Sequence, residues 1–181
     1  KVANGVNQYD FYLEISGGTA KGGEQTLYLP GAGTTKITGG ILSGTGRGIE
    51  IRAGKLIIEG GSITANAARK TDASANNGAS GSYTGVITAV KHAGVSENGY
   101  VGDIEIDISG GTFSNSLGDV VTVVHENSTN NYKQNITVNI TGGNFNGSWN
   151  IGNTVNNEGE FGTDTLSISG GNYTVDLSQY T

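Results

Sequence analysis

Three polar segments of the chain, residues 93–102, 126–134 and 152–163, place carboxylates and carboxamides beside an aromatic ring. Sugar-binding grooves use this combination, because the ring packs on a pyranose face while the polar groups hydrogen-bond to its hydroxyls. The candidate ligand-binding residues are Glu97, Tyr100, Glu126, Tyr132, Asn157 and Phe161, with Trp149 as a further candidate if it faces outward. Alternatively, these are ordinary solvated loop residues whose rings fasten the loops down.

The two histidines end two apolar segments that align residue by residue, 85–92 and 119–126. With Glu97 and Glu126 nearby, His92 and His125 could form an acid/base or metal site. Their offset of one residue can also send them to opposite faces of the chain. We therefore assign no catalytic and no metal-binding residue.

An acidic stripe, Asp103, Glu105 and Asp107, is predicted to face outward. Calcium prefers several oxygen ligands, some of them charged, and the aligned residues of the next segment are Asn135, Thr137 and Asn139. A solvated face is the better interpretation, and we expect neither a metal nor a cofactor.

A polysaccharide lyase would need a basic residue near the scissile sugar and a means of neutralising its uronate. Arg47, Arg52, Arg69 and Lys70 are the basic candidates, but no cluster of aspartates stands opposite them on the aligned segments. The net charge of -6 would also repel an anionic polysaccharide. The sequence leaves enzymatic activity open and favours a non-catalytic role.

The strands that would position these residues can be predicted from one six-residue sequence phrase, which occurs six times in the chain. Each copy has an isoleucine, a Ser, Thr or Glu, a Gly-Gly pair, any residue and, in most copies, a larger apolar one. The isoleucines are Ile15, Ile37, Ile58, Ile108, Ile140 and Ile168, and the last positions are Ala20, Leu42, Ile63, Phe113, Phe145 and Tyr173. A motif that recurs every few tens of residues predicts a solenoid in which each unit buries its apolar face against its neighbours. Both sets should form inward ladders, and the paired glycines should supply positive φ at the corner between them.

Successive Gly-Gly pairs lie 22, 21, 50, 32 and 28 residues apart. A second apolar phrase follows each of the first five pairs, at residues 27–29, 49–51, 86–90, 120–124 and 149–151. Only one such phrase falls in the 50-residue interval, which is therefore one turn with long insertions. Residues 103–108 and 135–140 alternate with a period of two, which is typical of strands. The prediction is an all-β, parallel β-helix (β-solenoid) of about six coils.

The composition of the chain indicates its domain organisation and excludes some classes of partner. We expect one domain over residues 1–181, excised from a larger protein, with residues 1–10 capping one end. The last turn, through Leu177 and Tyr180, either caps the other end or is cut short. The chain has no cysteine and no membrane-length apolar run. Its acidic balance argues against nucleic acid and anionic membrane surfaces.

The phrase at residues 108–114 and the closing segment at residues 170–180 carry a family resemblance. They resemble the Gly-Gly-Thr-Phe repeats of large surface proteins of Gram-positive bacteria. The resemblance implies a right-handed, pectate-lyase-like parallel β-helix in a secreted or wall-attached protein. It supplies no catalytic residues.

Together these observations lead us to expect a non-catalytic module for cell-surface adhesion or carbohydrate binding. The expected partner is a host or microbial glycan or a surface protein, and the expected location is extracellular, on a bacterial surface or secreted. We expect a monomer that neither binds nucleic acid nor enters a membrane. The alternatives are a structural stalk and a polysaccharide lyase or hydrolase of the pectate-lyase-like kind.

Overall fold

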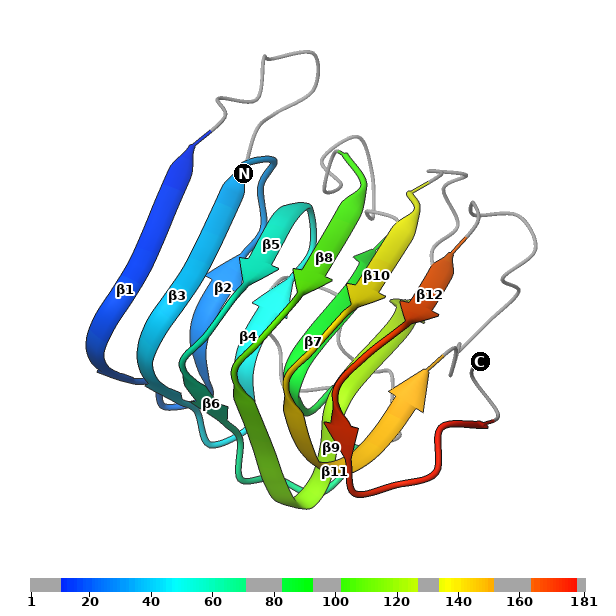
Figure 1. The fold of residues 1–181 in the computed structure, drawn as a ribbon. Helices are drawn as coiled ribbons and strands as arrows, with labels where there is room; N and C mark the ends of the chain where they lie inside the picture. Colours follow the sequence, from blue (N-terminus) through cyan, green and yellow to red (C-terminus); the bar gives the residue numbers. More distant parts are fainter. Residues whose placement is uncertain (1–10, 71–82, 93–101, 127–133, 152–163, 179–181) are drawn as a thin grey trace.

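The computed structural model describes residues 11–70, 83–92, 102–126, 134–151 and 164–178. This part of the chain is all-β, and every strand pair is parallel. Its thirteen strands belong to one open sheet that bends back on itself (Figure 1). The predicted all-β, parallel, solenoid-like arrangement is thus present.

The strands follow the chain in short segments separated by corners and loops. Their bounds are β1 Tyr12–Lys21, β2 Gln25–Leu29, β3 Thr34–Ser43, β4 Arg47–Ile51, β5 Gly54–Ile58, β6 Ser62–Thr64, β7 Gly85–His92, β8 Ile104–Ile108, β9 Thr112–Glu126, β10 Ile136–Ile140, β11 Asn144–Ile151, β12 Thr165–Ile168 and β13 Asn172–Tyr173.

A first stack contains the strand segments that precede each Gly-Gly pair, in β1, β3, β5, β8, β10 and β12. The six isoleucines pair one above the next in this stack, from Ile15 on Ile37 to Ile140 on Ile168. The four inner ones are at most 1% exposed, while Ile15 and Ile168, at the two ends, are half-buried. The predicted isoleucine ladder is confirmed.

A second stack begins just after each corner and carries the other predicted ladder. Ala20, Leu42, Ile63, Phe113, Phe145 and Tyr173 pair in that order. The Phe113 and Phe145 rings stack with centroids 4.6 Å apart, and those of Phe145 and Tyr173 lie 5.2 Å apart. Such contacts add to the stabilisation from burial.

A third stack joins β2, β4, β7 and the later halves of β9 and β11. Its inward ladder runs through Leu27, Ile49, Ile87, Val121 and Trp149. In the first stack β5 pairs directly with β8, which places Ile58 against Ile108. The 50-residue interval between their Gly-Gly pairs is therefore one turn of the repeat, as predicted.

The corners between the first and second stacks use the predicted glycine geometry. The second glycine of each pair has positive φ, for example 95° at Gly40 and 108° at Gly143. This region is accessible to glycine at little cost, whereas a β-branched residue resists it.

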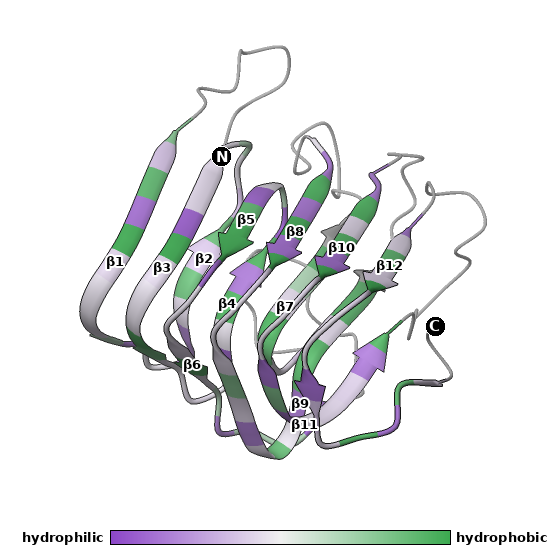
Figure 2. Cartoon of the chain, in the orientation of Figure 1, coloured by the Kyte–Doolittle hydropathy of each residue, from purple (hydrophilic) through white to green (hydrophobic). Residues whose placement is uncertain are grey.

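The outer faces of the stacks differ. Hydrophobic and hydrophilic residues alternate along β8 and β10 (Figure 2), and the apolar residues are buried while the polar ones are partly exposed. On the third stack the outward positions are also buried, because Glu50 and Thr88 are 0% exposed.

In the last turn Leu177 is buried and joins the main core. Tyr180 and residues 1–10, the other predicted cap residues, lie outside the described residues. No helix in the described part of the chain is long and apolar enough to cross a membrane.

Candidate functional site

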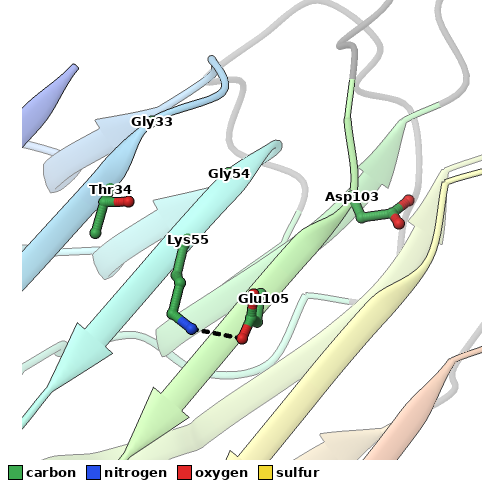
Figure 3. A pocket seen from close by; sticks show the side chains of 6 residues that line it. All are labelled: Gly33, Thr34, Gly54, Lys55, Asp103 and Glu105. Carbon is green, nitrogen blue, oxygen red and sulfur yellow. Dashed lines mark hydrogen bonds and ion pairs between the residues drawn. The ribbon is translucent and has the colours of Figure 1, made fainter. Parts of the chain in front are cut away.

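A shallow hollow of about 330 Å³ opens on the outer face of the first stack. It lies at the start of β3, β5 and β8, where Figure 3 shows Thr34, Lys55 and Glu105 on the three strands and Asp103 just before β8. Its lining residues are Gly33, Thr34, Gly54, Lys55, Asp103 and Glu105.

Two glycines contribute to the floor of the hollow, and one of them is required by the backbone. Gly54 has a φ of 89°, and a Cβ there would lie 2.6 Å from the carbonyl oxygen of Gly33. Contacts this close exclude any larger residue without backbone movement. Tight stacking of successive turns thus keeps this position free of a side chain.

Strand register places the polar side chains in one row. Thr34 pairs with Lys55, and Lys55 pairs with Glu105. Tyr12 extends the row on β1, because it pairs with Thr34 and is 63% exposed. Neighbouring strands are about 4.8 Å apart, so the row offers an aromatic ring, a hydroxyl, an ammonium and a carboxylate at regular steps.

Lys55 is held by two carboxylates. Its Nζ lies 2.6 Å from Oε1 of Glu105 and 2.8 Å from Oδ2 of Asp107. Hydrogen bonds to Asp107 and Glu105 raise the pKa of Lys55 above its ordinary 10.5, against the opposing effect of partial burial. Burial by itself would raise the pKa of Asp107, but hydrogen bonds from Lys55 and Asn139 bring it below 3.8.

Asp103, at the other side of the hollow, accepts hydrogen bonds from neutral groups. The backbone N–H of Asn135 donates to Oδ1 at 2.9 Å, and its Nδ2 donates to Oδ2 at 3.3 Å. The acidic stripe therefore faces outward, as predicted. The described residues contain no group of three His, Asp or Glu side chains placed to hold a metal ion.

The basic residues considered for lyase chemistry have structural partners. Arg47 and Arg52 are 1% and 0% exposed, and both contact Glu50, which is itself fully buried. The distances are 3.0 Å from Arg47 Nε to Glu50 Oε2 and 2.6 Å from Arg52 Nε to Glu50 Oε1. These guanidinium groups stabilise the third stack and do not line the hollow.

Arg69 joins three turns of the repeat. It donates to both carboxylate oxygens of Asp119, at 2.8 and 2.5 Å, and to the carbonyl oxygen of Trp149 at 2.7 Å. Ser148 Oγ donates to the same carboxylate at 2.8 Å. Asp119 is fully buried, so this bidentate pair fixes the segment after β6 against β9 and β11.

Trp149 does not meet the condition set for it as a ligand-binding residue. Its side chain is 5% exposed and faces the core, where it packs 5.5 Å from the Phe145 ring and 5.7 Å from the Tyr173 ring. The residue continues the ladder of Ile87 and Val121, and this explains its inward direction.

Most of the other predicted ligand-binding residues, Glu97, Tyr100, Tyr132, Asn157 and Phe161, lie outside the described residues. Glu126 ends β9 opposite His92, and His125 lies opposite Lys91. The two histidines are thus offset by one position on neighbouring strands, as the sequence alignment indicated. The directions of these side chains are not among the described features.

Sequence reasoning missed the contribution of Tyr12, Thr34 and Lys55. The signal was available, because aligning the isoleucines of the first three phrases puts Tyr12, Thr34 and Lys55 three residues before Ile15, Ile37 and Ile58. Each therefore shares the outward row with Glu105, three residues before Ile108.

Comparisons of the chain with protein-family models, with curated proteins and with solved structures found no match.

Proposed function

We propose that this chain is a non-catalytic carbohydrate-binding or adhesion module that acts outside a bacterial cell, on its surface or after secretion. The observation that carries the proposal is the row of Thr34, Lys55 and Glu105 across the hollow, which Tyr12 continues on the neighbouring strand β1. An exposed ring beside fixed hydrogen-bonding groups suits a sugar, which has an apolar ring face and a rim of hydroxyls.

The rigidity of the row supports this assignment. Its four members stand on paired parallel strands rather than on loops, so their spacing is set by backbone hydrogen bonds. Groups held in place before binding lose little conformational entropy on binding. The carboxylates of Asp103 and Glu105 already accept hydrogen bonds, which favours a binding role over proton transfer.

At the level of the fold, we propose a right-handed parallel β-helix of about six coils. Right-handed crossover is the physical preference for parallel β-connections. The Gly-Gly-Thr-Phe phrase at residues 110–113 supports the resemblance to repeats of Gram-positive surface proteins, and this resemblance supports the extracellular location.

A glycan array probed with the whole chain tests the function. We expect a small set of glycans to bind, each with an affinity in about the millimolar to micromolar range that becomes effective through many copies. Tyr12→Ala should remove the stacking contact, and Thr34→Arg should fill the hollow, so both should lose the signal. Thr165→Ala, on the same outer face at the far end of the stack, is the matched control.

A ligand that binds all three variants equally would place the site elsewhere. An array without any bound glycan would contradict the proposal and favour the stalk. Release of unsaturated products from a bound polysaccharide, measured by ultraviolet absorbance, would instead favour the lyase.

A further inference from the structure

Charge on the outer face of the first stack bears on which glycan the hollow accepts. The two lysines that the structure describes on this face are paired, Lys36 with Glu59 at 2.9 Å and Lys55 with Glu105 and Asp107. Two further carboxylates of this face, Asp103 and Glu14, accept hydrogen bonds from neutral groups and not from lysines. Asp103 accepts from Asn135, and Glu14 accepts from the Tyr12 hydroxyl at 3.1 Å. A ligand at the hollow therefore meets a surplus of negative charge.

We propose that the hollow binds a glycan that carries free amino groups, with an ammonium near Asp103 and Glu105 and a sugar ring on Tyr12. This inference rests on the proposed function and names the chemical class of its ligand. Both carboxylates line the hollow, and the side chain of Glu105 is 46% exposed, so a ligand can reach it. The exposed ring of Tyr12 offers its face to a sugar ring of the same ligand.

The same geometry disfavours acidic glycans. A uronate at the hollow would lie beside Asp103 and Glu105, while the ammonium of Lys55 is already shared between two carboxylates. Freeing Lys55 for the ligand would leave Glu105 and Asp107 close together without their common cation. Like charges at this distance repel, and the repulsion is weakened but not abolished by solvent.

The test compares three trisaccharides by titration calorimetry at about pH 6, where an amine is protonated. The probes are a β-1,4-linked glucosamine trimer, its fully N-acetylated counterpart and a galacturonate trimer. We expect the glucosamine trimer to bind at least about threefold more tightly than the N-acetylated one, the size of a partly exposed charge contact. The galacturonate trimer should bind most weakly.

Isosteric variants locate the effect. Asp103→Asn and Glu105→Gln should each reduce the preference for the amine. Asp176→Asn makes the same change in net charge at an exposed site near the C-terminal end, and it should leave the preference intact. Tyr12→Ala should weaken binding of the glucosamine trimer but not of trilysine, a cation without a sugar ring.

The outcomes separate this inference from the proposed function. Equal affinity for the amino and N-acetylated trimers, or preference for galacturonate, would overturn the amine assignment while leaving a glycan-binding module. Trilysine binding as tight as the glucosamine trimer would overturn it in favour of recognition of charge alone. If none of the trimers binds, the amine assignment fails, and the glycan array decides separately on the module.

Discussion

The charges of Arg47, Glu50 and Arg52 are buried together on the third stack. Glu50 contacts both guanidinium groups, and Arg47 also donates to the carbonyl oxygen of Tyr83 at 3.0 Å. Ions out of water are tolerated only when they are paired and hydrogen-bonded. The trio lies on and just after β4, and Arg47 joins this strand to neighbouring turns through Tyr83 and through Glu24, whose Oε1 lies 3.2 Å from Arg47 Nη2.

Glu50→Gln should be strongly destabilising, because it removes the buried carboxylate that both guanidinium groups contact and leaves Arg47 only its pair with the exposed Glu24 carboxylate. We expect a loss of about 3 to 5 kcal/mol in the free energy of unfolding, measured by urea denaturation. Glu59→Gln removes a surface carboxylate that pairs with Lys36, and it should cost less than about 1 kcal/mol. Similar losses in the two variants would show that the buried Glu50 carboxylate stabilises the fold no more than a surface carboxylate does.

Ionisation of Asp107 should make the free energy of unfolding depend on pH in the acid range. Its pKa in the folded chain is below 3.8, so its stabilising contribution is present above the unfolded pKa and is lost as pH falls through the folded one. Lys55, with a pKa above 10.5, keeps its charge throughout this range. Asp107→Asn should therefore be less stable than the wild type at about pH 7, with the difference shrinking below about pH 4.

Denaturation curves of the two proteins between about pH 2 and 7 measure this difference. A difference that stays constant down to the lowest pH would mean that ionisation of Asp107 contributes nothing.

At the scale of the strands, the corners depend on backbone stacking as much as on φ. A Cβ on Gly142 would lie 2.3 Å from the carbonyl oxygen of Ser109 on the turn before it. The equivalent glycine of the first phrase, Gly17, has nothing within 4 Å of such a Cβ. The same sequence position is thus constrained only where a preceding turn lies against it.

Gly142→Ala and Gly17→Ala form a matched pair. Gly142→Ala should lose about 1 to 3 kcal/mol, because rigid backbone must move to admit the methyl group. Gly17→Ala should stay within about 0.5 kcal/mol of the wild type or gain slightly, through reduced entropy of the unfolded chain. Equal effects of the two changes on chemical denaturation would show that contact with the preceding turn does not constrain Gly142.

The ladders could be predicted because the distance from each isoleucine to the next apolar position never changes. Ile58 and Ile108 share a register although a 50-residue interval separates their glycine pairs, since insertions lie outside the phrase. The burial of Arg47 and Arg52 could not be predicted in this way. Alternation separates inward from outward positions, but it does not tell whether the outward face is covered.

The candidate site was predictable only in part. The outward direction of Asp103 and Glu105 follows from alternation, whereas the ion pair with Lys55 requires the pairing of β5 with β8 and the reach of a long side chain. Trp149 shows the opposite case, because its ladder position already implied an inward direction.

For the whole molecule, stacking in one direction makes the ends unlike the middle. Among the described strands β1 pairs only with β3, and it is exposed at every position but Ile15, whereas β4, paired on both sides, is buried throughout. In stacked repeats, stability is approximately a sum of terms for each unit and for its contacts with neighbours. The end units lack one set of those contacts, so they should open before the rest.

Hydrogen exchange followed by mass spectrometry should therefore show a gradient along the stack. Amides of β1, β12 and β13 should exchange fastest, and those of β5, β8 and β10 slowest, because local opening needs less free energy where fewer apolar contacts are lost. Ile15→Ala should accelerate exchange in β1 and its neighbours β2 and β3 while leaving β10 unchanged, whereas Ile140→Ala should accelerate the middle of the stack. Uniform protection from β1 to β13, or acceleration of β10 by Ile15→Ala, would mean that the stack opens as one cooperative unit and not from its ends.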